Sequence, residues 1–284
     1  MNDRRSIALV GCLWVVAMGT MLAAVSIARQ VHRALPSMVE LETHRLRVQR
    51  QGTGSPAIVL ETFGRAPLEI WNGVVAELAP ETSVFAYDHA GYWGSESGPK
   101  PRDARRVATE LRMALTRAGV PPPYLLVGYS FGGPYIRVFA DLYPREVAGM
   151  VFIDPSQEAF LWWLREHFPE INRVTGEDRS REEEWGCQDE SMQQAASARI
   201  PEVPVTLISA TLQRDVIARN LLPPLWRAHA RWIEAIPGSK HVIAPEDDHG
   251  IVFTNPQLIA DEVREMLVRI RGNRTQSVVR GGGR

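Results

Sequence analysis

The stretch of sequence that decides the fold is residues 124–132, which read YLLVGYSFG. A short apolar run is followed here by G-x-S-x-G, the pattern in which a serine stands on a sharp turn between a strand and a helix. Gly128 and Gly132 leave room for that turn, and a helix-like segment follows. Because the strand and the helix are the setting that the pattern requires, we predict that Ser130 is a nucleophile.

Apolar runs and amphipathic helical segments alternate on both sides of this motif. Such alternation is typical of a mostly parallel sheet flanked by helices. Two stretches, residues 107–118 and 259–270, carry apolar side chains at helical spacing. We therefore predict an α/β domain over residues 36–271, with strands at residues 57–61, 84–87, 124–128, 148–153, 204–209 and 240–244.

The alternation is interrupted between residues 155 and 200. This segment holds an aromatic piece at residues 160–168 and then an acidic run at residues 182–184, and we interpret it as a small helical cap. The C-terminal end lacks apolar periodicity and finishes in RGGGR. We expect a disordered tail over residues 272–284.

The N-terminal region carries a long apolar run. Residues 7–28 have no charged side chain, and a helix of this length, at about 1.5 Å per residue, matches the hydrocarbon thickness of a bilayer. A transmembrane anchor with its flanks over residues 1–35 is the simplest interpretation. A cleaved signal peptide is the alternative, although its apolar part usually has only about 7–15 residues. We expect a single-pass membrane protein whose folded domain is extracytoplasmic.

Composition excludes several other classes of protein. A formal net charge of −1 argues against a nucleic-acid partner, since such proteins usually carry an excess of Lys and Arg. The two cysteines, Cys12 and Cys187, lie too far apart in sequence and setting to predict a disulfide. No Cys/His cluster with metal-ligand spacing is present, so we expect no metal and no organic cofactor.

A serine hydroxyl needs a base that takes its proton and returns it to the leaving group. Among the seven histidines, His249 follows the last predicted strand, in the loop PEDDHG at residues 245–250, and precedes the final amphipathic helix. A nucleophile–acid–histidine chain order requires the base at this place. Of the other histidines, His32 lies beside the membrane segment. We expect the remaining five to be surface or structural residues: His44, His89, His167, His229 and His241.

Two aspartates are candidates for the acid that orients the histidine. Asp154 ends the predicted strand at residues 148–153, whereas Asp215 lies five residues beyond the strand that ends near Ala210. Asp154 offers the shorter reach, although an Asp before Pro155 is also a common turn cap. Both assignments stay open at this point.

An oxyanion hole requires two N–H donors where negative charge develops. One is expected from the backbone of Phe131, the residue after the nucleophile. The second is expected from the loop after the strand at residues 57–61, where ETFG occupies residues 61–64. Phe63 or its neighbour Thr62 would donate through the backbone.

With these residues in place, residues 41–271 resemble the α/β-hydrolase superfamily, particularly bacterial members that are membrane-anchored or exported. The resemblance implies an α/β-hydrolase fold with a Ser-His-Asp triad. In similar hydrolases a carboxylate at the end of the strand after the nucleophile helix can serve as the acid, which favours Asp154. Besides the loop of His249, the resemblance is carried by residues 58–62 (IVLET), 86–92 (AYDHAGY), 120–133 (VPPPYLLVGYSFGG) and 147–156 (VAGMVFIDPS).

Two departures from the family pattern bear on the shape of the substrate: GYWGS at residues 91–95, where relatives tend to read GYGWS, and the acidic cap. Haloalkane dehalogenases and epoxide hydrolases are similar in outline but use an aspartate where this chain has Ser130. We therefore expect hydrolysis of a small-molecule or lipid carboxylic ester. An acyltransferase or peptidase with the same triad, or a noncatalytic binding module of this fold, are the alternatives.

Overall fold

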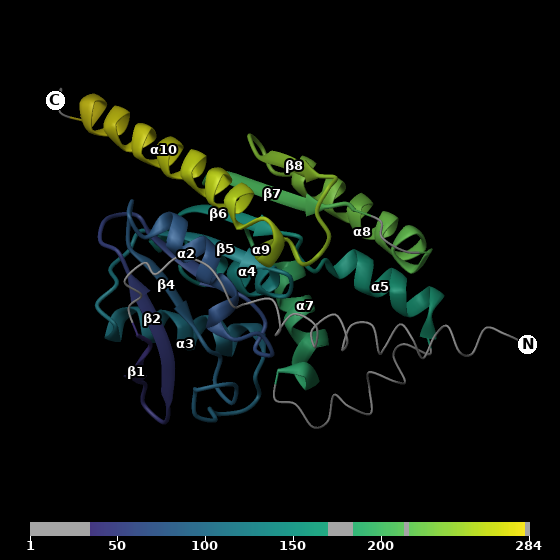
Figure 1. Ribbon diagram of the computed structural model, residues 1–284, viewed down its shortest axis with the longest axis horizontal. Coiled ribbons are helices and arrows are strands. Elements are labelled where there is room, and N and C mark those ends of the chain that lie inside the picture. The colour runs from purple at the N-terminus through teal and green to yellow at the C-terminus, as the bar shows by residue number, and fades with distance from the viewer. Residues whose placement is uncertain (1–34, 170–183, 213–215, 282–284) are drawn as a thin grey trace, which may run out of the picture.

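The computed structural model describes residues 35–169, 184–212 and 216–281 of the 284-residue chain (Figure 1). The predicted membrane anchor lies outside these residues, and so does Asp215. None of the helices within the described ranges combines the length and the apolar character that a membrane span needs.

An eight-stranded sheet forms the centre of the described domain, in the order β1-β2-β4-β3-β5-β6-β7-β8. From β4 to β8 neighbouring strands pair in parallel, whereas β2 pairs antiparallel with both β1 and β4. The strands are β1 (Ser37–Glu40), β2 (Arg45–Gln51), β3 (Ala57–Glu61), β4 (Val84–Tyr87), β5 (Tyr124–Tyr129), β6 (Val147–Ile153), β7 (Val205–Ala210) and β8 (Lys240–Ala244).

The strands β1 and β2 were not predicted from the sequence. Strand β2 reads RLRVQRQ and buries only part of its residues, while β1 has four residues of which one is buried. Charged side chains at alternate positions are tolerated because β1 is the edge strand and β2 is next to it, in an antiparallel part of the sheet where one face can be exposed to solvent. Each of the six predicted strands lies within one residue of its predicted bounds. Five of them are buried at all positions or all but one, whereas β8, at the opposite edge of the sheet, has one buried residue.

Helices cover both faces of the sheet, and each face has its own hydrophobic core. In β5, Leu126 packs on one face and Leu125 and Val127 on the other, because successive side chains of a strand point to opposite sides. One face is covered by α3 (Ala104–Arg117), α4 (Gly132–Leu142), α7 (Gln188–Ser197) and α8 (Val216–Glu234), and the other by α2 (Asn72–Leu78), α9 (Ile251–Thr254) and α10 (Pro256–Gly281).

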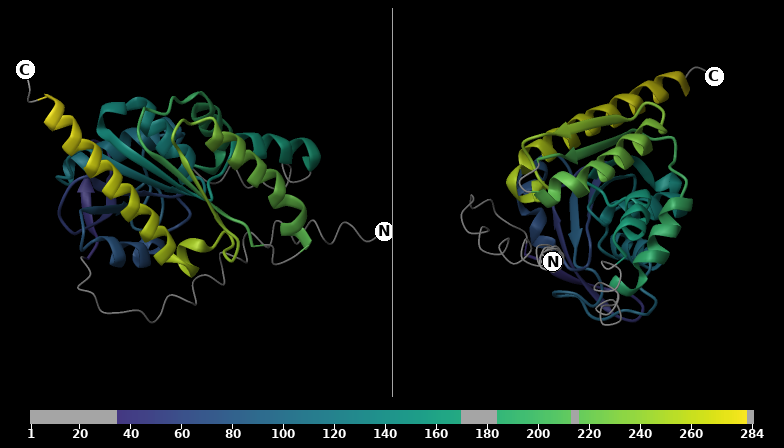
Figure 2. Two further views of the ribbon diagram at one scale, coloured as in Figure 1. Left: turned by 90° about the horizontal axis from the view of Figure 1, so that it is seen from above. Right: turned by 90° about the vertical axis from the view of Figure 1, so that its right-hand side faces the viewer.

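Helix α10 is the long yellow helix that crosses the sheet in Figures 1 and 2, and its C-terminal end projects beyond the body of the domain. Its apolar stripe from Ile259 to Ile270 is buried. The helical backbone then continues to Gly281, through residues for which we predicted a disordered tail. Once a helix is nucleated, further residues can join it without being packed against a core. The helix can therefore continue beyond the end of the apolar pattern.

In the described part of the predicted cap, helices α5 and α7 have different surroundings. Helix α7 buries Met192 and Ala195 against the core that also contains α3 and α4. Helix α5 (Glu158–His167) has no fully buried residue, and Trp162 on it is 48% exposed. Figure 1 shows α5 beside α8, beyond the carboxyl ends of the central strands.

Candidate active site

Ser130 stands on the turn between β5 and α4 with a φ of 54°, in the left-handed region that non-glycine residues rarely adopt. The backbone holds this conformation through two amides, those of Gly133 and Ser156, which donate to the Ser130 carbonyl oxygen at 3.1 and 3.0 Å. Gly128 makes the turn possible, because a Cβ there would lie 2.8 Å from the carbonyl oxygen of Gly132. The hydroxyl is thereby presented at the carboxyl end of the sheet.

His249 and Asp154 lie beside Ser130 in one hydrogen-bonded chain. The His249 Nδ1 atom is 2.6 Å from Asp154 Oδ2, and its Nε2 atom is 3.1 Å from Ser130 Oγ. A carboxylate only accepts hydrogen bonds, so Nδ1 carries the proton and Nε2 of the neutral ring is the acceptor for the serine hydroxyl. This arrangement lets His249 remove the proton from Ser130.

Asp154 follows β6 and is almost completely buried, with 3% of its side chain exposed. Its φ of 39° is also left-handed. Besides His249, its carboxylate accepts a hydrogen bond from the backbone N–H of Ala210 at 3.3 Å. Asp154 therefore occupies the position of an acid that orients the histidine, while the alternative Asp215 lies outside the described residues.

Tyr129, the residue before Ser130, supports the loop that carries His249. The Tyr129 hydroxyl donates to the His249 carbonyl oxygen at 2.6 Å, and the two rings lie 5.1 Å apart. Burial raises the pKa of Tyr129, and the nearby Asp154 raises it further, so the phenol stays protonated as a donor. Sequence analysis did not single out this residue, since the variable position of G-x-S-x-G carries no signal of such a contact.

The two residues predicted to form the oxyanion hole lie side by side. Phe131 is the N-cap of α4, and its ring centroid is 5.9 Å from that of Phe63 in the loop after β3. A Cβ on Gly132 would lie 2.3 Å from the Glu61 carbonyl oxygen. The loop after β3 therefore packs directly against the start of the nucleophile helix.

Carboxylates engage the amides on either side of Phe63. The Thr62 N–H donates to Glu61 Oε1 at 2.8 Å, and the Gly64 N–H donates to Glu184 Oε2 at 3.1 Å. Because the Thr62 N–H already donates to a carboxylate, Phe63 is favoured over Thr62 as the second donor of the predicted oxyanion hole. Glu184 belongs to the acidic run that we assigned to the cap, yet its side chain is fully buried.

A second serine–histidine pair lies elsewhere in the structure. Ser209 Oγ is 2.8 Å from His229 Nδ1 and 2.9 Å from His241 Nε2, and His229 Nε2 donates to the Pro155 carbonyl oxygen at 2.7 Å. Ser209 and His229 are both completely buried. Their hydrogen bonds tie β7, β8 and α8 together, as expected for structural residues.

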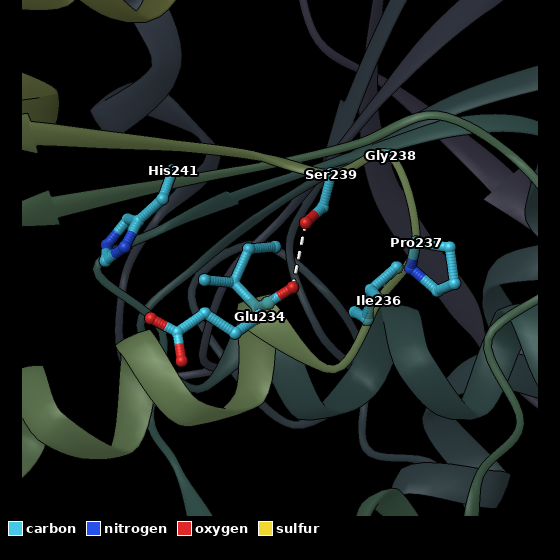
Figure 3. A pocket seen from close by; sticks show the side chains of 7 residues that line it. Glu234, Ile236, Pro237, Gly238, Ser239 and His241 are labelled. Atoms are coloured by element: carbon cyan, nitrogen blue, oxygen red, sulfur yellow. Dashed lines mark hydrogen bonds between the residues drawn. The ribbon is translucent and has the colours of Figure 1, made fainter.

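A cavity of about 340 Å³ lies between the end of α8 and the start of β8. Figure 3 shows Glu234, Ser239 and His241 around it. Because parallel strands place their carboxyl ends at one edge, this cavity at the amino end of β8 is remote from the edge that carries Ser130. Across the described part of the chain, no group of His, Cys, Asp and Glu side chains has an arrangement suited to a metal ion.

Comparisons with known proteins agree with this architecture. A model of the alpha/beta hydrolase fold family matches residues 58–169. A protein of Hormonema carpetanum described as a probable transporter, efuK, is 25% identical over 86% of this chain and 44% of its own length. An uncharacterised Bacillus subtilis protein, YqjL, is 33% identical over 38% of this chain and 42% of its own length. The chain thus spans less than half the length of these curated relatives.

Among solved structures, a thermophilic esterase from Thermogutta terrifontis superimposes with a TM-score of 0.58 at 19% identity, covering 84% of this chain and 99% of the esterase. At this identity the likeness establishes the fold alone. The matched family and the strand order together confirm the predicted fold class: the chain has the α/β-hydrolase fold.

Proposed function

We propose that this protein is a serine hydrolase that cleaves carboxylic esters, with Ser130 as nucleophile, His249 as general base and Asp154 as orienting acid. The observation that carries the proposal is the hydrogen-bonded chain from Asp154 through His249 to Ser130 at 2.6 and 3.1 Å. The family match and the esterase among the structural neighbours support a hydrolase.

In the acylation step Ser130 Oγ attacks the ester carbonyl carbon while His249 Nε2 takes the hydroxyl proton. Negative charge develops on the carbonyl oxygen, and the backbone N–H groups of Phe131 and Phe63 would stabilise it. When the tetrahedral intermediate collapses, the C–O bond of the ester breaks. His249 returns its proton to the departing alcohol, and an acyl group remains on Ser130.

In the second half of the reaction a water molecule attacks the acyl-enzyme. His249 takes a proton from this water, and the same oxyanion donors stabilise the second tetrahedral intermediate. Its collapse breaks the bond to Ser130 Oγ, which recovers its proton from His249, and releases the carboxylic acid. Asp154 keeps the proton on His249 Nδ1 and stabilises the imidazolium that forms in both steps.

Aromatic side chains of the cap favour an apolar acyl or alcohol group in the substrate. Helix α5 starts four residues after Asp154 and carries Phe160 stacked on Trp163, whose ring also stacks on His167 at 4.7 Å. Trp162 on the same helix is half exposed. A small-molecule or lipid ester would fit beside such a surface.

A fluorophosphonate probe tests the proposal, because it reacts only with an activated serine. The full-length protein, purified in detergent, is treated with the probe and the labelled residue is mapped by mass spectrometry. We expect labelling at Ser130 that is lost in both Ser130→Ala and His249→Ala. Folded wild-type protein that remains unlabelled would contradict the proposal and favour a noncatalytic binding module.

We also propose that residues 1–35 anchor the protein in a membrane, with the hydrolase domain on the extracytoplasmic side. The uncharged run of residues 7–28 supports this proposal. Cell fractionation, together with protease treatment of intact spheroplasts, tests it. Recovery of the full-length protein in the soluble cytoplasmic fraction would contradict it.

A further inference from the structure

A fully buried group of charged side chains lies behind the loop that carries Phe63. His89, which follows β4, places its Nε2 atom 2.6 Å from Glu61 Oε1 and its Nδ1 atom 2.7 Å from Glu184 Oε1. Both carboxylates are 0% exposed and the imidazole is 1% exposed. Since both ring nitrogens face carboxylates, both carry protons, and His89 is an imidazolium.

The electrostatics of the group agree with this assignment. Burial by itself would lower the pKa of His89, but the two carboxylates outweigh burial and raise it to about 10. Glu110 and Arg102 add a further buried ion pair, with Arg102 Nη2 lying 3.7 Å from Glu184 Oε1. The two cations therefore balance two of the three carboxylates behind the loop. This matters because unbalanced carboxylates would oppose an oxyanion nearby.

The same two carboxylates hold the backbone of the loop. Glu61 accepts from the Thr62 N–H and from the Tyr87 hydroxyl, the latter at 2.6 Å. Glu184 accepts from the Gly64 N–H and from the hydroxyl of Tyr135, which belongs to the nucleophile helix α4. Phe63 thus lies between two amides whose positions are set by buried carboxylates.

The two ends of the loop differ in what supports them. The backbone of Glu61 and Thr62 packs so closely against Gly132 that a Cβ at that position would lie 2.9 Å or less from atoms of both residues. At the other end, Glu184 binds the Gly64 amide and connects it to His89 and to α4. Glu184 lies 120 residues further along the chain, in the cap segment, and reaches the loop only in the folded protein.

We infer that Glu184 is a positioning residue that fixes the Phe63–Gly64 peptide through the Gly64 N–H. With this peptide fixed, the backbone at Phe63 cannot rotate freely, and the preceding Thr62–Phe63 peptide keeps its N–H in the orientation that the oxyanion requires. This inference rests on the proposed function. The charge of Glu184 holds the His89 imidazolium in place, and its Oε2 atom holds the loop. An electrostatic donor must be placed to within fractions of an ångström, so loss of Glu184 impairs the chemical step more than substrate binding.

The test compares full-length wild type with Glu184→Ala, Glu184→Gln and Tyr135→Phe. The matched control is Glu158→Gln, which weakens another, partly buried link between the cap and α4, the Glu158–Arg137 ion pair at 2.8 Å. For each protein we would measure thermal unfolding, the rate of fluorophosphonate labelling at Ser130, and kcat and KM for a p-nitrophenyl ester across pH.

We expect Glu184→Ala to lower both the labelling rate and kcat at least about tenfold, a fraction of the effect of removing an oxyanion donor, with KM changed less than about threefold. Glu184→Gln, which keeps an oxygen acceptor, should recover part of the activity. The shape of the pH profile of kcat should not change in these variants. Glu158→Gln should stay within about threefold of wild type.

If Glu184→Ala does not fold, Glu184→Gln and Tyr135→Phe supply the result, and both should slow labelling while remaining folded. A labelled wild type whose folded Glu184 variants react at the wild-type rate would overturn the positioning role alone. The positioning role would also be overturned if Glu158→Gln lost as much activity as Glu184→Ala, or if Glu184→Ala raised KM and left kcat unchanged. An unlabelled wild type overturns both this inference and the proposed function.

Discussion

The hydroxyl of Tyr129 donates a 2.6 Å hydrogen bond to the carbonyl oxygen of His249, so the residue before Ser130 supports the loop that carries His249. Nucleophile and base are 119 residues apart in sequence. Because Tyr129 and Ser130 are adjacent, this hydrogen bond fixes the position of the His249 loop relative to Ser130.

Replacing Tyr129 with Phe should therefore lower kcat for an ester substrate by about two- to tenfold, equivalent to a net hydrogen bond of about 0.5–1.5 kcal/mol. Tyr124→Phe is the matched control, since the Tyr124 hydroxyl is also buried on β5 but donates to Val120 at the other end of the strand. Both variants should lose stability in urea unfolding. An equal kcat loss in both would show that Tyr129 acts only through stability.

Asp154→Asn should remove the acceptor that keeps the proton on His249 Nδ1. We expect kcat to fall by about three to four orders of magnitude, the effect that loss of the orienting acid has in a serine triad. Steady-state kinetics would measure it, with Asp261→Asn on the exposed side of α10 as control. Near wild-type kcat in Asp154→Asn would point to another acid, of which Asp215 is the first candidate.

Gly132→Ala should disrupt the contact between the nucleophile helix and the oxyanion loop, because the new Cβ would lie 2.3 Å from the Glu61 carbonyl oxygen. We expect a destabilisation of about 1–3 kcal/mol and slower fluorophosphonate labelling. Gly272→Ala meets no atom within 4 Å and should stabilise helix α10 by about 0.5–1 kcal/mol. Equal unfolding free energies for the two variants would contradict the packing described above.

The pKa of His89, raised to about 10, predicts how stability depends on pH. A group whose pKa is raised on folding stabilises the protein fully below its unfolded value near 6.5, and the contribution is lost as pH rises towards 10. The free energy of unfolding should therefore fall between pH 7 and 10, by at most about 1.4 kcal/mol per pH unit for this proton.

Urea unfolding at pH 7, 8.5 and 10 would measure this dependence. In Glu184→Gln one of the two carboxylates is gone, so the pKa of His89 should lie closer to its ordinary value and the fall above pH 8 should be shallower. A wild-type stability that is constant or rises over this range would be inconsistent with an imidazolium at His89.

Much of the fold could be predicted from sequence because its central strands are buried on both faces and are therefore continuous apolar runs. The hydrogen-bonded chain of Ser130, His249 and Asp154 also follows from local position, since each residue directly follows a strand or lies in the loop after one, and parallel strands bring these ends together. The catalytic roles of the three residues stay predictions until labelling is measured.

Other features could not be predicted, for identifiable physical reasons. Strand β2, the second strand from the edge, alternates charged or polar and apolar residues and resembles a surface loop in sequence. Glu184 stands in an acidic run, and such runs are usually solvated; its burial depends on partners at His89 and Gly64, 95 and 120 residues away. Long-range pairing of this kind leaves no local pattern in a single sequence.

Helix α5 has no fully buried residue although it begins four residues after Asp154. Substitutions on its surface would create no cavity in the core and would leave the hydrogen bonds of Ser130, His249 and Asp154 unchanged. Under the proposed function, the helix beside the ester substrate can thus change in sequence at little cost in folding stability. For directed evolution, α5 is the place to build a library that alters substrate preference while the reaction itself is preserved.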